Sequence, residues 1–211
     1  MSMIPDKPPF KLLDILYKKE FILFIVLVSI LIINSNISPY FLDLYNLIDS
    51  TFLFSEKAII ALTMTFVIIA RQIDLSVASI IAVSSCVLGY TTSLGYDTWL
   101  VISLTLLSGA LCGAFNGAII TKFAIPSIIV TIGTMSLFRG LAYSFLEDSY
   151  YNKFPKLVSN LGSGYLFGYI PYAFLTFLLL SLVFAFILHK TSVGKKMYSI
   201  GTNPDAAQYT V

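Results

Sequence analysis

The sequence is poor in the residues that carry most enzymatic chemistry. It contains one histidine, His189, and two cysteines, Cys86 and Cys112. His189 follows an apolar run, where a helix C-terminus would stabilise it, and no base–nucleophile pair accompanies it. The cysteines fit neither a metal-ligand spacing nor a disulfide framework. Paired carboxylates inside apolar runs and phosphate-binding glycine loops are missing too. We therefore predict that the chain is not an enzyme and binds no metal or cofactor itself.

Charged residues are also scarce. They make up 11% of the chain, whereas hydrophobic residues make up 57%, and the mean hydropathy is +0.87. This composition is too apolar for the surface of a soluble protein of this size. A net charge of +2 gives no reason to expect a nucleic-acid partner. The composition instead predicts an all-α integral membrane protein whose surroundings are the lipid bilayer.

Apolar runs of membrane-spanning length define the domain organisation. A cytoplasmic N-terminal segment (1–20) is expected before a transmembrane domain (21–188), and a cytoplasmic segment (189–211) after it. The domain is a bundle of about six helices, with spans near 21–42, 53–70, 74–93, 99–120, 126–146 and 170–188. A cytoplasmic N-terminus places most lysines and arginines inside, so the positive-inside rule predicts an N-in, C-in topology.

Polar residues interrupt the second and third runs, in the stretch VIIARQIDLSVASII. Arg71, Asp74 and Ser76 form this helix junction. Asp74 is expected to offer its carboxylate to the free N–H groups of a helix that begins at Leu75, and Arg71 to lie at the cytoplasmic face. A tight turn of this kind is favoured over a contact with substrate. Because no solvated linker fits here, the junction must pack against other protein.

Three glycines recur at intervals of four in the fourth run: Gly109, Gly113 and Gly117. Their common helix face predicts a close approach by another helix, so we interpret them as packing residues. Asn116 beside them is ambiguous, because an amide in a bilayer needs a partner in protein or water. It is a candidate to line a path.

The fifth run carries a mildly polar stripe, formed by Ser127, Thr131, Thr134 and Phe138. Hydroxyls and an aromatic ring suit a sugar, yet hydrogen bonding within the bundle explains each residue at least as well. Arg139 follows the stripe, and it either extends to the outer interface or pairs within the bundle. These residues and Asn116 form the candidate substrate path.

Three stretches carry a resemblance to a known family: IDLSVASI (73–80), NGAIITKFAIPSIIVTIGTMSLFRGLAY (116–143) and GKKMYSIGTNPDAAQYT (194–210). Together they resemble permease subunits of bacterial ABC importers of the ribose/rhamnose/xylose/autoinducer type, within the branched-chain-type permease superfamily. The chain from about residue 58 onward resembles the first part of a type II importer permease. Family members often carry glycines where this chain has Arg71 and Gln72, and many have one at Ala78.

The resemblance implies a multi-pass protein of the bacterial plasma (inner) membrane that helps to import a monosaccharide or a sugar-like signal. It further implies three protein partners: a periplasmic or surface substrate-binding protein, a cytoplasmic ABC ATPase that uses the ATP, and a second permease subunit in a homo- or heterodimer. The ATPase is expected to dock on the coupling segment, at Gly201, Asn203, Asp205, Ala206 and Ala207.

Two alternatives remain open beside the importer subunit. Permeases of this type continue past the Gly-Thr-Asn-Pro-Asp-Ala-Ala segment, so the resemblance implies C-terminal truncation and, with it, a possible non-transporting membrane fragment. An ion-coupled secondary carrier is the other alternative. Such a carrier needs an ionisable group at the midplane of a broken helix.

Overall fold

The structure, a computed structural model, describes residues 19–146 and 150–203. It confirms an all-α integral membrane protein. Within those residues, five helices are long and apolar enough to cross a bilayer, namely Lys19–Ile37, Leu44–Ile69, Thr98–Phe123, Ser127–Leu146 and Tyr172–Lys190. A sixth apolar helix, Val77–Ser93, is shorter. Each predicted span overlaps one of these six helices.

The chain divides into two compact units, Met1–Ser50 and Thr51–Val211, and each is described by itself. The first contains α2 (Lys19–Ile37) and the beginning of α3 (Leu44–Ile69). The span predicted to reach residue 42 ends at Ile37, because Pro39 disfavours helical backbone in the residue before it. The next helix begins at Leu44 rather than at 53, and the Asp43 carboxylate accepts a hydrogen bond from the Tyr45 backbone N–H at 3.2 Å.

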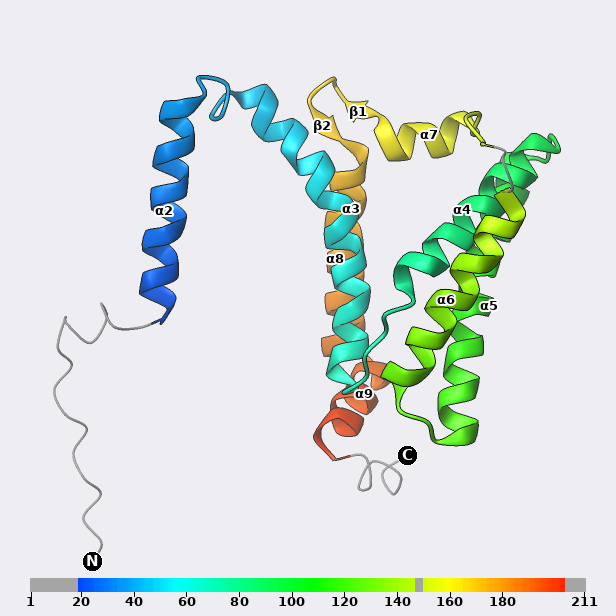
Figure 1. Cartoon of the computed structure of the whole chain (residues 1–211). Helices are drawn as coiled ribbons and strands as arrows, with labels where there is room; N and C mark the ends of the chain where they lie inside the picture. The colour runs from blue at the N-terminus through cyan, green and yellow to red at the C-terminus, as the bar shows by residue number, and fades with distance from the viewer. Residues whose placement is uncertain (1–18, 147–149, 204–211) are drawn as a thin grey trace, which may run out of the picture. The chain divides into compact units, whose positions relative to one another are not determined.

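The second unit contains a group of three packed helices, α4 (Val77–Ser93), α5 (Thr98–Phe123) and α6 (Ser127–Leu146) (Figure 1). The Phe115 ring of α5 meets the Phe138 ring of α6 edge to face, with 6.2 Å between centroids. Asp97 caps α5 by accepting from the Trp99 N–H at 2.9 Å. Pro126 precedes the first turn of α6, and its carbonyl accepts from the Ile129 and Val130 N–H groups.

A second pair of helices consists of α3 and α8 (Tyr172–Lys190). Their rings meet edge to face at two levels, Phe54 with Phe177 at 6.1 Å and Phe66 with Phe184 at 5.0 Å. Such contacts favour close packing of the two helices along their length.

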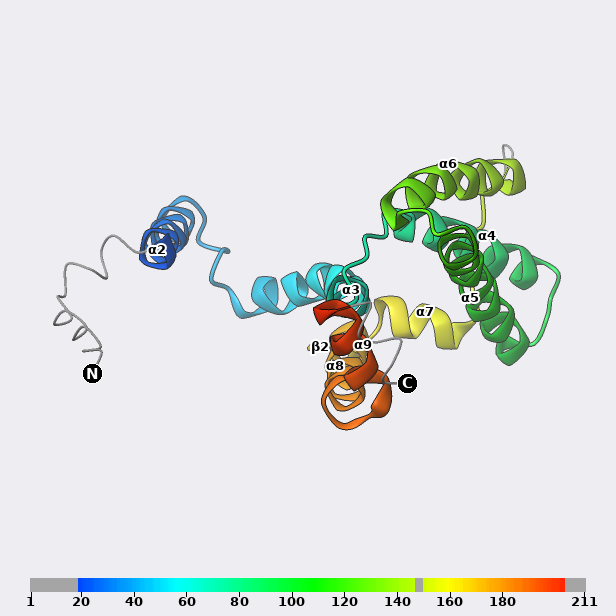
Figure 2. The same ribbon diagram turned by 90° about the horizontal axis from the view of Figure 1, so that it is seen from below.

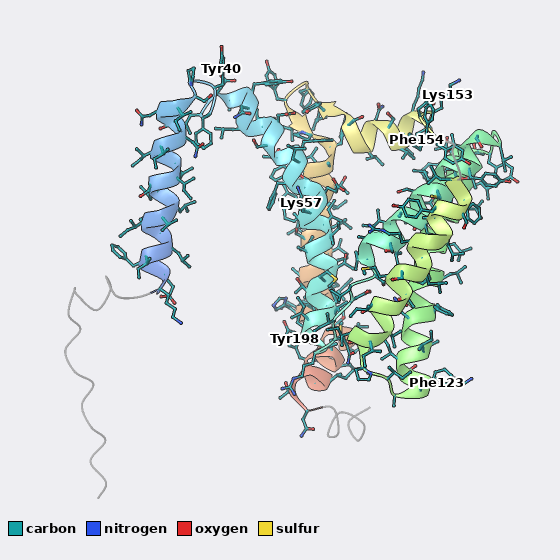
Figure 3. All side chains as sticks on the ribbon, viewed as in Figure 1. Tyr40, Lys57, Phe123, Lys153, Phe154 and Tyr198 are labelled. Atoms are coloured by element: carbon teal, nitrogen blue, oxygen red, sulfur yellow. The ribbon has the colours of Figure 1, made fainter. Side chains whose placement is uncertain are left out.

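Shorter elements lie at the two ends of the second unit. At one end are α7 (Lys156–Ser163) and a hairpin of β1 (Tyr165–Leu166) and β2 (Ile170–Pro171), in which Tyr165 pairs with Pro171. At the other end α9 (Ser192–Thr202) lies beneath α3 and α8 (Figure 2). Figure 3 shows Lys153 and Phe154 at the hairpin end, and Tyr198 and Phe123 at the α9 end.

Candidate functional site

The helix junction seen in the sequence is a stretch of non-helical backbone between α3 and α4, residues 70–76, which we call the break segment. Arg71 has a positive φ of 56°, the left-handed conformation that usually ends a helix at glycine. Its N–H donates to the Ile68 carbonyl at 2.9 Å, and the Gln72 N–H donates to the Val67 carbonyl at 3.0 Å. These two bonds form a Schellman-type end to α3.

Asp74 stabilises the break segment in a way that differs from the prediction. Helix α4 begins at Val77 and not at Leu75, and its N-cap residue is Ser76. The Asp74 carboxylate accepts from the Ser76 N–H at 2.8 Å and from the Ser76 hydroxyl at 2.6 Å. Asp74 therefore closes a local Asx turn ahead of the helix instead of capping its first turn.

Side chains from α5 and α6 fix the break segment in place. The Asn116 amide of α5 donates to the Ser76 hydroxyl at 2.8 Å. On α6, the Ser127 hydroxyl accepts from the Ile73 N–H at 3.0 Å, and the Thr131 hydroxyl lies 3.3 Å from the Ile73 carbonyl. Irregular backbone in a membrane protein is tolerated where protein groups satisfy it, as Ser127 and Thr131 do for Ile73, whereas Asn116 holds the Ser76 side chain.

The break segment enters the bundle rather than staying at its edge. Ser76 is completely buried, and Asn116, which binds it, precedes the end of α5 at Phe123 by seven residues. At 1.5 Å per residue this corresponds to about 10 Å along the helix axis. The Ser76 end of the break segment is therefore packed inside the bundle.

A cavity of about 300 Å³ lies against the break segment, and we call it the break cavity. Its walls come from α3, α5, α6, α9 and the break segment, and include Phe66, Asp74, Asn116, Thr131 and Met197. Asn116 is only 4% exposed, and its Oδ1 atom has no hydrogen-bond partner among the described residues. The cavity walls are mostly apolar.

The three glycines of α5 do not share one environment, which corrects the packing interpretation. A Cβ added to Gly109 would meet the Ser84 hydroxyl at 3.2 Å, so α4 approaches α5 closely there. At Gly113 and Gly117 a Cβ would meet nothing within 4 Å. Both line the break cavity. Within the described residues, Gly109 is the packing glycine, whereas Gly113 and Gly117 leave space.

Comparison with known proteins agrees with this architecture. Residues 46–210 match the model of a family described as "Branched-chain amino acid transport system / permease component". The chain therefore belongs to this permease family. No solved structure matches it significantly.

Individual relatives within the permease family are named as importers. The chain is 34% identical over 192 residues to the ribose import permease protein RbsC of Haemophilus influenzae, covering 88% of this chain and 58% of the relative. It is 36% identical over 189 residues to RbsC of Bacillus subtilis, covering 87% and 58%. Identity to the autoinducer 2 import system permease protein LsrD of Klebsiella pneumoniae is 33% over 196 residues, covering 90% and 59%. The chain thus spans less than two thirds of these permeases.

The structure gathers only part of the candidate path of this permease around the break. Ser127, Thr131 and Asn116 meet the break segment, as described above. Thr134 and Phe138 are buried further along α6. Arg139 lies apart from them, at a second cavity of about 340 Å³ next to Tyr143 and Tyr151.

The coupling segment begins as α9, which ends at Thr202, and Asn203 is its C-cap residue. A Cβ added to Gly201 would overlap the Ile69 carbonyl oxygen, so α9 crosses directly against the end of α3. Asp205, Ala206 and Ala207 lie outside the described residues. Met197 of α9 was not a sequence candidate, because nothing local marks a methionine that lines a cavity with residues far away in the chain.

Proposed function

We propose that this chain is the membrane subunit, or part of it, of an ATP-driven importer for a monosaccharide or sugar-like signal. The break segment supports this proposal, because protein groups from two other helices hold the non-helical backbone between α3 and α4 inside the bundle. In membrane proteins, non-helical backbone of this kind is tolerated where it is buried in protein or lines a water-filled cavity. The names of the relatives, ribose import and autoinducer 2 import permeases, support the substrate class.

The proposal includes partners. Helix α9 contacts the end of α3 through Gly201. The chain leads directly from that end of α3 into the break segment. An ATPase bound to α9 and the residues after it would therefore be mechanically close to the break. We propose an ABC ATPase at this end, a substrate-binding protein at the α7 and hairpin end, a second permease subunit beside the bundle, and residence in the bacterial inner membrane.

Uptake by the host tests the function. Deleting the gene for this chain should abolish accumulation of one labelled sugar from a panel of ribose, xylose, rhamnose and galactose, and restoring it should recover accumulation. Uptake should stop when ATP is depleted and should persist when a protonophore collapses the proton gradient while ATP is maintained. Unchanged accumulation of every sugar after deletion would contradict the proposal.

An ion-coupled carrier is the second candidate, since Asp74 is a half-buried carboxylate in the non-helical backbone between α3 and α4. It predicts the opposite pattern, in which collapse of the ion gradient stops uptake although ATP is plentiful.

Co-purification tests whether the ATPase docks on the coupling segment. Ala207→Arg should abolish recovery of the ATPase with the affinity-tagged chain from host membranes, because a long charged side chain would prevent close contact with the partner. Lys196→Arg keeps the charge of α9 and should leave recovery unchanged. Equal recovery with both variants would remove the coupling segment from the docking surface.

A further inference from the structure

Arg139 is a charged residue in a membrane-spanning helix, and it has no counter-charge among the described residues. It lies on α6, whose 20 residues correspond to about 30 Å, the thickness of the hydrocarbon core. Seven residues, or about 10 Å, separate it from the end of α6 at Leu146. Arg139 is exposed, and its side chain forms no ion pair or hydrogen bond with another described residue. An arginine in this position calls for an anionic partner.

The cavity of about 340 Å³ at this residue, which we call the Arg139 cavity, lies between α4, α6 and the segment that follows α6. Arg139 and Tyr143 are four residues apart and therefore share one face of α6. Both are exposed, and both line the cavity. Cys86 of α4 and Ala142 of α6 line it too, and the Cys86 thiol donates to the Ala142 carbonyl at 3.6 Å. The cavity is thus a site between two packed helices, lined in part by an exposed arginine.

Tyr151 forms part of the Arg139 cavity because α4 has a glycine opposite it. A Cβ added to Gly89 would lie 2.5 Å from the Tyr151 ring, so a larger residue there would displace the tyrosine. Phe154 also lines the cavity, and Lys153 stands beside it at the hairpin end (Figure 3). The segment after α6 is therefore packed onto α4, and it brings a second positive charge to this end of the bundle.

The cavity lining selects the kind of anion. A guanidinium group binds phosphate oxygens through two parallel hydrogen bonds. Most of the other lining residues are apolar, among them Ala142, Leu146 and Phe154, and none of the described lining residues is acidic. A soluble anion gains little from apolar walls, whereas a phospholipid carries its phosphate on apolar chains and reaches the helix face from the bilayer. Tyrosine rings are typical of the level at which headgroups meet hydrocarbon.

We propose that the Arg139 cavity binds the phosphate of an anionic phospholipid, with the Arg139 guanidinium as the main donor and the Tyr143 hydroxyl as a second donor. The arginine reaches its counter-charge by extending towards the headgroups, as long basic side chains near membrane interfaces do. A zwitterionic headgroup binds less well, because its ammonium group would lie near Arg139 and Lys153. This lipid site is separate from the break cavity and does not depend on the importer function.

Quenching of a single tryptophan by brominated lipids tests the site. Trp99, the one tryptophan of the chain, is changed to phenylalanine, and Phe154→Trp places a reporter in the cavity lining. The purified chain is reconstituted into phosphatidylcholine vesicles that contain a fixed share of either brominated phosphatidylglycerol or brominated phosphatidylcholine. The anionic lipid should quench the reporter more strongly, corresponding to several-fold tighter binding.

Matched variants separate this site from general contact with lipid. Leu182→Trp replaces an exposed residue of α8 and should be quenched equally by the two lipids. Arg139→Gln should remove the preference at the Phe154→Trp reporter, whereas Arg139→Lys keeps the charge and should retain most of it. A preference that is equal at both reporters, or that survives Arg139→Gln, overturns the proposal.

Two further measurements identify the source of the negative charge. Inorganic phosphate at millimolar concentration should leave quenching by phosphatidylglycerol unchanged, and relief of quenching would mean that the site takes a soluble anion instead. Glu147 and Asp148 lie outside the described residues, and Glu147→Gln combined with Asp148→Asn removes their charges. The preference should be present with and without this double change. If it appears only in the double variant, the chain's own carboxylates neutralise Arg139 and the proposal is wrong.

Discussion

Asn116 of α5 and Ser76 at the start of α4 share a buried hydrogen bond of 2.8 Å across 40 residues of sequence. Ser76 also donates to Asp74 at 2.6 Å, so one hydroxyl links Asn116 of α5 to Asp74 in the break segment. Ser76→Ala should lower the free energy of unfolding by about 1–3 kcal/mol, because it leaves the Asn116 amide and Asp74 without this partner. Thermal unfolding in detergent measures the loss.

Ser103→Ala provides the control for that variant. The Ser103 side chain is exposed and bonds only the Trp99 carbonyl of its own helix, at 2.8 Å. Its removal should change stability little. Equal melting temperatures for the Ser76 and Ser103 variants would show that the hydroxyl is not structurally important.

A leucine at Gly109 should destabilise the helix bundle, whereas one at Gly113 should not. The Cβ position at Gly109 already lies 3.2 Å from Ser84 Oγ and 3.9 Å from an Ile80 methyl group, so three further carbons must push α4 away. Overpacking of this kind costs about 1–3 kcal/mol. Detergent stability of Gly109→Leu and Gly113→Leu gives the comparison. A larger loss for Gly113→Leu would mean that another helix covers the break cavity.

Gly201→Ala should loosen α9 from α3. The new methyl group would overlap the Ile69 carbonyl oxygen, which is main chain and cannot rotate away. Limited proteolysis near residues 190–203 should therefore become several-fold faster. Gly162→Ala is the matched control, because its Cβ meets nothing within 4 Å. Unchanged cleavage of Gly201→Ala would contradict the close crossing.

Arg71→Gly should stabilise the end of α3 by about 1 kcal/mol, since glycine adopts the left-handed conformation without the penalty of a side chain. Ala124, which ends α5 with φ of 51°, should show a gain of the same sign when changed to glycine. Ala118→Gly, inside α5, should instead cost about 0.5–1 kcal/mol. Chemical denaturation of the three variants tests the signs.

Side-specific labelling tests the N-in, C-in topology. In the chain without Cys86 and Cys112, Ser159→Cys on α7 should react with an impermeant thiol reagent in intact cells, and Ser192→Cys at the start of α9 should react only after lysis. Reaction of the Ser192 variant in intact cells would reverse the orientation.

The approximate positions of the apolar helices were accessible from sequence, because the length of an apolar run reflects the thickness of hydrocarbon that it crosses. The end of α2 and the start of α3 were not. The late start of α4 was not. Leu75, Ser76 and Val77 read locally as the beginning of a helix, while the long-range bonds at the break join Asn116 to Ser76 and the α6 hydroxyls to Ile73. Those contacts depend on tertiary packing, which periodicity does not encode.

The three glycines of α5 also show that local sequence does not predict tertiary contacts. An interval of four correctly predicts that Gly109, Gly113 and Gly117 share one face of α5. It does not say what lies opposite each of them: α4 packs against Gly109 through Ser84, whereas Gly113 and Gly117 line the break cavity. The position of Met197 at the break cavity could not be predicted for a related reason. Met197 lies on α9, which follows α8 and is far from the break segment in the sequence.

The break segment also constrains how the protein is made. Its Ile73 N–H finds its partner Ser127 only 54 residues later. At roughly 5–20 residues per second, a ribosome needs about 3–11 s to cover that distance. Because an unpaired backbone N–H is unfavourable in lipid, we expect α4 to insert stably only once α6 has been made. A hydrogen bond then constrains the order of membrane insertion in addition to the hydrophobicity of each helix.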